Sequence, residues 1–375
     1  MRKNIVHIIT GLNNGGAEAM LYKLLRETNQ EKYNVTVISM LDEGVMGSKI
    51  EILGIKILCL RLSKFNFVQA FKQAIDVCRQ ADIIQCWMYH ANLFGYIVNL
   101  FCHKKLIWGI RRGHLIQGQD KPMTIMIAKI CAKLSGNVDK IIYCAKKSKI
   151  FHEHIGYSKQ YAQVIPNGFD LEQFYRRGNE GEQFRLKEGI PSTATMIAFV
   201  GRYDTVKGYD NFIKAFSRIK DRFDKNNLFA VCAGTQVDTD NKQLVELIEQ
   251  YGIKDSVKLL GRRDDISVVL SAADFFVSAS YTEAFSNAIG EAMACELPCV
   301  VTDVGDSAYI VDDTGIVVEN NNVDELVNGI RQLFAMSEKE RAFLGRGARC
   351  RIKKLFDIKA VVKQYEELYE QGTKN

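Results

Sequence analysis

The feature that most constrains the fold is an alternation of short apolar runs with helical segments along the whole chain. The runs are rich in β-branched residues, and continuous apolar strands separated by helices are typical of parallel sheets covered on both faces. Two such series predict an α/β fold with two doubly wound, Rossmann-like domains. The expected strands are 5–10, 35–39, 57–60, 83–87, 106–110 and 141–144, then 196–200, 228–232, 257–260, 275–278, 299–302 and 316–318.

A chain of 375 residues is too long for one ordinary core, which also favours two domains. Turn residues and charges cluster between residues 165 and 191, where the apolar periodicity lapses. We place the first domain at 1–170 and the second at 171–357. Open α/β sheets bind ligands at the carboxyl ends of their strands, so we expect a cleft between two facing domains.

Cysteine, histidine and apolar patterns indicate a cytoplasmic protein. The ten cysteines form no CxxC pair and many lie in apolar runs, which predicts reduced, buried thiols. No zinc-binding spacing is present. The N-terminal apolar stretch is too short for a signal peptide. Residues 83–103 lack charged side chains, but polar residues interrupt them, so we expect a buried strand and helix rather than a membrane span.

The first strand leads into a glycine-rich turn that runs from Thr10 to Glu18 and contains Asn14, Gly15 and Gly16. Such glycines allow backbone amides to approach an anion at the positive end of a helix, which predicts a phosphate nearby. The other interpretation is a turn that serves close packing alone. The turn is not the GxGxxG fingerprint, and this argues against a nicotinamide oxidoreductase.

Cationic and acidic residues follow two strands of the second half. Arg202 comes directly after one strand and Lys207 lies in the loop before the next helix, so the two side chains can hold a diphosphate. Glu283 follows another strand, where it can accept hydrogen bonds from sugar hydroxyls. A helix expected from Ser286 places Asn287 at its phosphate-favouring end and Glu291 one turn later, toward a ribose. Capping or solvated glutamates are the alternative.

With these residues the sequence resembles the family-four retaining glycosyltransferases, which have the GT-B fold. Glu283 and Glu291 match the E-x7-E signature of that family. The other matching segments, in order, are Gly15-Gly16-Ala17-Glu18, Val164 to Asp170 with Phe174, Gly201-Arg202 with Lys207-Gly208, Leu260-Gly261, and Glu291 to Cys295 with Thr302 to Gly305. The chain departs from the pattern at Ala284, Glu296 and Asp306, where the family commonly has glycine.

The resemblance implies a retaining transfer from a UDP- or GDP-linked sugar, of hexosyl or N-acetylhexosaminyl type. Arg202 and Lys207 would stabilise the departing phosphate, Glu283 would orient the sugar, and Glu291 would bind the ribose. Backbone at Gly261 and Arg262 would meet the base. The acceptor would be a glycan or polyprenyl-linked sugar in cell-surface polysaccharide synthesis. No cofactor, metal or nucleic acid is expected, and the last helix, 358–375, is expected to return to the first domain.

The family's catalytic-loop histidine has no clear counterpart. After the strand at 106–110 the chain reads Arg111-Arg112-Gly113-His114, so Arg111 or His114 is a candidate contact to an acceptor or phosphate. The sequence does not say which of the two fills the role. It is also silent on the donor sugar, the nucleobase, the acceptor, the linkage and the oligomeric state.

Two rival functions fit parts of the sequence. Asp238-Thr239-Asp240 is a DxD triplet, which metal-dependent glycosyltransferases of another fold use, although capping of the next helix is the preferred interpretation here. A non-catalytic two-domain sugar-binding protein is the second rival. Such a protein needs no paired Arg and Lys anion site.

The charge distribution suggests a membrane partner. Residues 1–165 contain 23 Lys and Arg against 11 Asp and Glu. Basic and apolar residues mix at helical spacing from Lys121 to Ser135, and with Lys104, Lys105, Lys146, Lys147 and Lys149 they could rest on an anionic bilayer. Ordinary core packing and an ordinary solvated surface are the alternatives. We therefore expect a cytoplasmic protein that is peripheral on the cytoplasmic face of the membrane.

Overall fold

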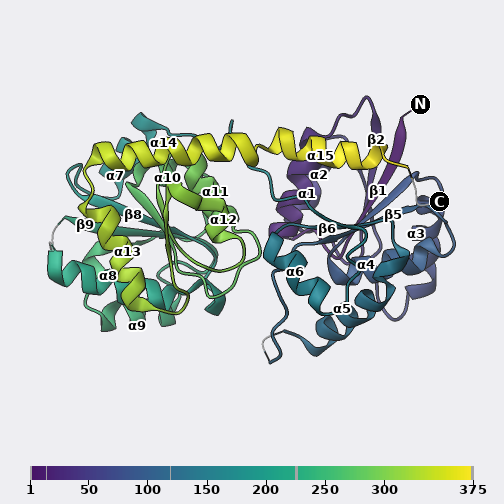
Figure 1. Ribbon diagram of the computed structural model, residues 1–375, viewed down its shortest axis with the longest axis horizontal. Coiled ribbons are helices and arrows are strands. Elements are labelled where there is room, and N and C mark those ends of the chain that lie inside the picture. Colours follow the sequence, from purple (N-terminus) through teal and green to yellow (C-terminus); the bar gives the residue numbers. More distant parts are fainter. Residues whose placement is uncertain (1, 14, 119, 224–226, 373–375) are drawn as a thin grey trace. The chain divides into compact units, whose positions relative to one another are not determined.

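The computed structural model describes residues 2–13, 15–118, 120–223 and 227–372. The chain divides into two compact units. Unit 1 comprises residues 1–168 and 358–375, and unit 2 comprises residues 169–357. Each unit is an α/β structure built on one parallel sheet, which confirms the prediction of two Rossmann-like domains (Figure 1).

Unit 1 contains a seven-stranded sheet in the order β3-β2-β1-β4-β5-β6-β7, and all of its strand pairs are parallel. The sequence predicts six of these strands and misses β7, which is short and only half-buried at the sheet edge. The strands are β1 (Lys3–Ile9), β2 (Tyr33–Ser39), β3 (Lys56–Cys59), β4 (Ile83–Trp87), β5 (Lys105–Ile110), β6 (Lys140–Tyr143) and β7 (Ala162–Val164).

Helices cover both faces of this sheet, as the apolar strands require. Successive strand residues point to opposite faces, so Ile107 packs with α1 and α15, whereas Trp108 packs with α3, α4 and α5. Figure 1 shows α15, from the end of the chain, beside α1. The helices are α1 (Gly16–Glu27), α2 (Gly44–Ile52), α3 (Phe67–Arg79), α4 (Met88–Asn99), α5 (Pro122–Leu134), α6 (Lys146–His154) and α15 (Ile358–Glu370), with a short 3-10 helix at Ser135–Asn137.

The uncharged stretch at 83–103 forms β4 and α4, as predicted. Tyr89 and Phe94 of α4 are buried in the core. No helix in the described part of the chain is both long and apolar enough to cross a membrane.

Lys105 is a correction to the basic surface expected from the sequence. Its side chain is buried, and its ammonium group donates hydrogen bonds to the carbonyls of Leu368, at 2.6 Å, and Gln371, at 2.5 Å. The last carbonyls of a helix lack partners within the helix and carry partial negative charge. Lys105 therefore caps the C-terminal end of α15 and holds it in unit 1, rather than facing a bilayer.

Unit 2 contains a six-stranded parallel sheet in the order β10-β9-β8-β11-β12-β13. All six strands are predicted from the sequence to within one residue at either end. They are β8 (Thr195–Val200), β9 (Leu228–Ala233), β10 (Val257–Leu259), β11 (Phe275–Ser278), β12 (Cys299–Thr302) and β13 (Ile316–Val318).

One face of the second sheet packs with α8, α9 and α13, which contribute Phe212, Leu244 and Ile330 to a common core. Helices α10, α11 and α12 also contact the sheet, and α7 and α14 pack on α10 and α11. The helices are α7 (Gly178–Lys187), α8 (Tyr209–Phe223), α9 (Lys242–Gln250), α10 (Ile266–Ala272), α11 (Asn287–Ala294), α12 (Ser307–Val311), α13 (Val323–Ala335) and α14 (Glu338–Leu355), with 3-10 turns at Thr205–Lys207, Lys254–Ser256 and Asp312–Thr314.

The aromatic ring of Phe169 supports α11. A β-carbon at Gly290 would lie 2.0 Å from that ring, so only glycine permits the ring to approach the helix this closely. The Phe169 ring also stacks with Phe285 at 6.1 Å and meets Phe356 edge-on at 6.5 Å. The segment after Asn167 thus positions the helix that carries Glu291.

The ten cysteines are all described and all are free thiols, as predicted. Eight are buried, Cys59 is half-buried and Cys350 is exposed.

The departure from glycine at Glu296 has a structural cost, whereas those at Ala284 and Asp306 do not. Glu296 follows the end of α11 and has a φ of 63°, in the left-handed region. A side chain in this conformation costs about 1–2 kcal/mol, and glycine is favoured just after a helix for that reason. Ala284 and Asp306 are not among the residues with positive φ in the described chain.

We therefore predict that Glu296→Gly raises the free energy of unfolding by about 1 kcal/mol, because the relief of strain exceeds the added freedom of the unfolded chain. The carboxylate is 4.0 Å from Arg349 and contributes little. Urea unfolding measures the change. Glu296→Ala is the control, since it removes the carboxylate but keeps the β-carbon. An equal gain in both variants would show that strain is not the cause.

Gly208 fixes the turn between β8 and α8. It has a φ of 69°, and a β-carbon there would lie 2.0 Å from the carbonyl oxygen of Ala279. Gly189, which follows α7, has a similar φ of 67° but no described atom within 4 Å of the same position. The two glycines therefore separate backbone strain from steric overlap.

Gly208→Ala is predicted to destabilise the protein by about 2 kcal/mol more than Gly189→Ala does, because forced overlap adds about 1–3 kcal/mol to the shared strain. Comparison of the two urea midpoints tests this difference. Equal losses in the two variants would mean that the contact of Gly208 with Ala279 does not hold the turn.

Candidate functional site

The candidate site of unit 2 lies at the point where the strand order reverses. β8 and β11 are neighbours at the middle of the sheet, and their connections leave toward opposite edges. Ligands of open α/β sheets bind at such a switch point, outside the carboxyl ends of the strands. The amide of Tyr281 donates to the carbonyl of Val206 at 2.8 Å, so the loops that follow β8 and β11 are bonded to each other.

Lys207 and Glu283 form an ion pair between these two loops. The ammonium group of Lys207 contacts Oε1 of Glu283, and the Ser280 hydroxyl donates to the same oxygen at 3.1 Å. The side chains are only 23% and 13% exposed, so solvent screens the pair weakly. The structure thus brings together two residues to which the sequence assigned separate roles on the donor.

Arg202 lies in the same loop as Lys207 but is held differently. Its guanidinium group binds Oδ2 of Asp204, with Nε at 2.9 Å and a terminal nitrogen at 2.8 Å. Asp204 also accepts from the amide of Val206 at 3.2 Å, so it caps the 3-10 turn that leads to Lys207. Sequence reasoning missed Asp204, although an Asp just before a helical turn is a recognisable capping signal.

Helix α11 begins where the sequence predicts, with Ser286 as its N-cap residue. Within the described chain the Ser286 side chain makes no capping hydrogen bond. The first amides of a helix have no acceptor within the helix, and such a helix end favours an anion. Asn287 is in this first turn and Glu291 lies one turn further along, both half-buried.

A tight turn at Gly305 and Asp306 packs against the backbone of the Glu283 loop. Gly305 has a φ of 51°, and a β-carbon there would lie 2.5 Å from the carbonyl oxygens of Glu283 and Ala284. The amide of Asp306 donates to the carbonyl of Ala284 at 3.0 Å. The segment after β12 that contains Gly305 thus positions the backbone of Glu283.

Gly261 lies in the turn two residues after β10, with a φ of 65°. Its amide donates to the carbonyl of Val237 at 2.7 Å, and its own carbonyl accepts from Gly234 at 2.9 Å. These bonds join the turns after β9 and β10. Arg262, which follows, is exposed. The assignment of both residues to the base stays a prediction.

The DxD triplet does not cap α9, which corrects the expectation from the sequence. Asn241 is the N-cap, and its side chain accepts from the amide of Leu244 at 3.2 Å. Asp238 instead accepts from the amide of Asp240 at 3.2 Å, within the preceding turn. The described residues contain no group of three or more His, Cys, Asp or Glu side chains that could hold a metal ion.

In unit 1, Gly15 and Gly16 lie where the sequence places them, at the start of α1. Asn14 lies outside the described residues. The carboxylate of Glu18 folds back over this helix end, with one oxygen 2.2 Å from where a β-carbon of Gly15 would be. Burial raises the pKa of the Glu18 carboxyl, and nearby Asp42 adds to the rise. An acidic side chain thus occupies the place expected for a phosphate. The assignment of Gly15 and Gly16 to phosphate binding stays a prediction.

Arg111 is held within unit 1. One terminal nitrogen donates to Oδ1 of Asn167 at 2.8 Å, the other donates to the hydroxyl of Tyr365, and the guanidinium lies 5.0 Å from the ring centre of Trp87. These contacts connect the end of β5 with the segment before unit 2 and with α15. An acceptor or phosphate role for Arg111 stays a prediction.

His114 lies edge-on against Phe151 of α6, with the ring centres 6.1 Å apart. Burial and the neighbouring charge of Arg112 lower the pKa of the His114 imidazole, so this ring is mainly neutral at pH 7. A neutral imidazole can accept a proton, but no described contact assigns it that task. The role of His114 also stays a prediction.

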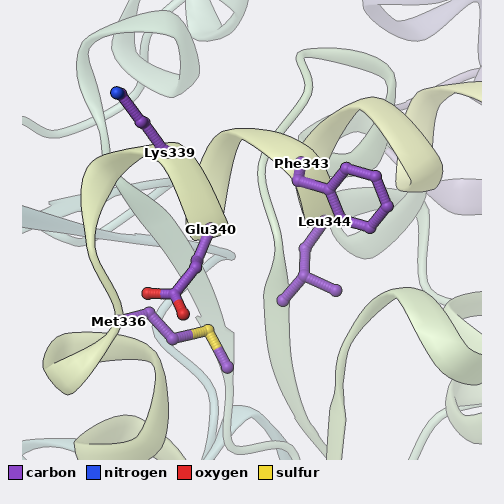
Figure 2. Close-up of a pocket in the computed structure, with 5 residues that line it drawn as sticks. All are labelled: Met336, Lys339, Glu340, Phe343 and Leu344. Atoms are coloured by element: carbon purple, nitrogen blue, oxygen red, sulfur yellow. The ribbon is translucent and has the colours of Figure 1, made fainter.

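A hollow of about 370 Å³ at the start of α14 is separate from the candidate site (Figure 2). It is lined by Met336, Lys339, Glu340, Phe343 and Leu344. The Glu340 carboxylate is engaged in a capping box with Ser337, and Figure 2 shows Lys339 directed away from Met336. The polar groups of the hollow therefore do not converge.

Comparison with known proteins identifies the family. Residues 14–173 match the family described as Glycosyltransferase Family 4, and residues 181–350 match Glycosyl transferases group 1. The chain is 27% identical over 209 residues to N-acetyl-alpha-D-glucosaminyl L-malate synthase of Bacillus anthracis, which covers 55% of this chain and 53% of that protein.

A second relative is the UDP-Gal:alpha-D-GlcNAc-diphosphoundecaprenol alpha-1,3-galactosyltransferase of Escherichia coli. It is 28% identical over 209 residues, with 55% of this chain and 53% of that protein covered. The chain thus spans about half the length of these curated relatives.

Among solved structures, Anabaena HepE in complex with UDP superposes with a TM-score of 0.87 at 20% identity, covering 98% of this chain and 99% of that one. This likeness shows the fold, which is GT-B. The two family matches, which together span most of the chain, show that it belongs to the group 1, family-four glycosyltransferases.

Proposed function

We propose that this protein is a retaining, metal-independent glycosyltransferase. It transfers a hexosyl or N-acetylhexosaminyl group from a UDP- or GDP-linked sugar to a glycan or lipid-linked acceptor, in the synthesis of a cell-surface polysaccharide. The observation that carries the proposal is the Lys207–Glu283 pair at the switch point of the second sheet, beside the N-terminal end of α11.

Two cationic side chains and a helix N-terminus at this place suit a diphosphate, with each cation positioned by a carboxylate, Lys207 by Glu283 and Arg202 by Asp204. The ammonium of Lys207, the guanidinium of Arg202 and the first amides of α11 stabilise the negative charge that develops on the departing nucleotide. No step of this kind needs a protein general base. The acceptor hydroxyl attacks from the leaving-group side, and the departing phosphate takes its proton, which is the retaining course implied by the family resemblance.

Glu283 orients both the cation and the sugar. Its Oε1 is engaged by Lys207 and Ser280, while a carboxylate has further lone pairs that can accept sugar hydroxyls. Glu291, one turn into α11, is placed to accept from a ribose diol. Uridine is the favoured base because the structurally similar HepE was solved with UDP and with UDP-glucose.

A lipid-linked acceptor is supported by two relatives whose names include diphosphoundecaprenol or diphospho-undecaprenol substrates. The basic residues of unit 1 support peripheral contact with an anionic membrane on the cytoplasmic side. Lys121, Lys129 and Lys133 are all exposed along α5 and its start.

Glu283→Ala is predicted to lower transfer and donor hydrolysis at least about 100-fold, as loss of one stabilising group at a transition state commonly does. The release of nucleoside diphosphate from a panel of nucleotide sugars measures this effect. Glu249→Ala is the matched control, because Glu249 pairs with Lys254 at 2.7 Å on the exposed surface of the same unit. Full turnover by folded Glu283→Ala would remove Glu283 from the mechanism.

The donor itself is predicted to raise the unfolding temperature of the wild-type protein. A ligand at 100 times its Kd adds about 2.7 kcal/mol to the stability of the state that binds it. Thermal unfolding with UDP and GDP, and with their sugars, identifies the base. Stabilisation by neither nucleotide would contradict the proposed substrate class.

Membrane contact is predicted to be electrostatic. The protein should co-sediment with vesicles containing phosphatidylglycerol at low salt and be released at about 0.5 M salt, because salt screens exposed charges. Vesicles of phosphatidylcholine alone are the control. Absence of co-sedimentation with the anionic vesicles at low salt would eliminate the peripheral-membrane proposal.

A further inference from the structure

Unit 1 contains a largely apolar groove that the donor chemistry does not use. It lies between α5, α6 and the later part of the loop after β5, which contributes Leu115, Gln117 and Asp120, and its volume is about 1010 Å³. Small-molecule pockets commonly measure about 300–1,000 Å³. Its apolar lining includes Leu115, Ile125, Met126, Ile130, Phe151 and Ile155.

The apolar residues of α5 remain accessible in this groove. Met126 is 49% exposed and Ile130 is 37% exposed, and they lie one turn apart on the same helix face. Ile127 and Cys131, on the adjoining face, are buried in the core. The core therefore accounts for one face of α5, whereas Met126 and Ile130 on the groove face stay partly exposed to solvent.

The charge of the groove is positive. Lys129 and Lys133 line it, one helical turn apart, and neither ammonium group has an ion-pair partner in the part of the chain that the structure describes. Asp120 is the carboxylate among the described lining residues. Its two oxygens are engaged by Arg112 and, at 2.8 Å, by the amide of Ile116. Arg112 thus neutralises Asp120 and leaves the two lysines uncompensated.

These two features together specify the chemistry of the occupant. A hydrocarbon chain gains from leaving water for the apolar lining, and an anionic head gains from the paired ammonium groups. Free sugars and nucleotides have no hydrocarbon chain that could fill the apolar part of the groove. An isoprenoid phosphate or diphosphate has both parts.

We propose that this groove binds the proximal isoprenoid units of the acceptor's lipid carrier, with Lys129 and Lys133 on its phosphate groups. The inference rests on the proposed lipid-linked acceptor, and it adds the place and the residues that recognise the lipid. It differs from general membrane contact because the ligand enters a groove rather than resting on a charged surface.

The test uses farnesyl diphosphate as a soluble probe, titrated calorimetrically into the full-length protein. Saturating UDP is present so that the proposed donor site is filled. Met126→Glu and the double variant Lys129→Glu/Lys133→Glu should each weaken binding at least tenfold. Inorganic diphosphate and farnesol, which carry only the head or only the chain, should bind at least tenfold more weakly than the whole probe.

Matched controls come from the same unit. Met123 is 58% exposed on α5 but does not line the groove, and Lys159 is exposed beyond α6. Met123→Glu and Lys159→Glu should leave the dissociation constant within twofold of wild type. Circular dichroism of each variant checks that unit 1 remains folded.

Several results would overturn the groove assignment. They are the absence of farnesyl diphosphate binding, equal losses in groove and control variants, or binding of inorganic diphosphate as tight as that of the probe. Donor hydrolysis is measured in parallel, since the groove variants should retain it. If the wild-type protein does not hydrolyse the donor, the proposed function is contradicted. If it hydrolyses the donor but does not bind farnesyl diphosphate, only the assignment of the groove is contradicted.

Discussion

The contact between Lys207 and Glu283 depends on how a doubly wound sheet is built. Both residues follow strands that end at the same sheet edge, and β8 and β11 are neighbours although 76 residues separate the two side chains. The parallel arrangement brings their loops together, and backbone bonding between Tyr281 and Val206 fixes the register of the loops. A cation and a carboxylate are thus held together where little of either side chain is exposed to solvent.

The surrounding sequence motifs have structural tasks that explain their residue types. Glycines at 208, 290 and 305 occur where a β-carbon would overlap a carbonyl oxygen or the ring of Phe169. These contacts set the Lys207 turn, the position of α11 and the backbone under Glu283. The signature glutamates therefore depend on backbone packing as much as on their own chemistry. Glu296 shows that glycine is not required at every such position, because a residue with a side chain is accommodated there in a strained backbone conformation.

Much of the fold could be predicted from the sequence because long apolar runs leave few alternatives to buried parallel strands. β7 was missed because three half-buried residues at an edge carry almost no pattern. The start of α11 at Ser286 and the burial of eight cysteines were also predictable, from a capping residue and from apolar neighbours.

Details that depend on distant partners were not predictable. Nothing near Lys105 in the sequence indicates that it binds the end of α15, more than 260 residues away. The same holds for Arg111, whose partners are Asn167 and Tyr365, and for the direct pairing of Lys207 with Glu283. Sequence motifs located the candidate residues, but tertiary structure decided which of them meet.

The central claim is that unit 2 binds the diphosphate of the donor at Lys207 and at the N-terminal amides of α11. A crystal structure of the protein grown with UDP tests it most directly. We predict phosphate oxygens within hydrogen-bonding distance of the Lys207 ammonium and of the first amides of α11, with the ribose at Glu291. A diphosphate bound remote from Lys207 and Glu291 would contradict the account.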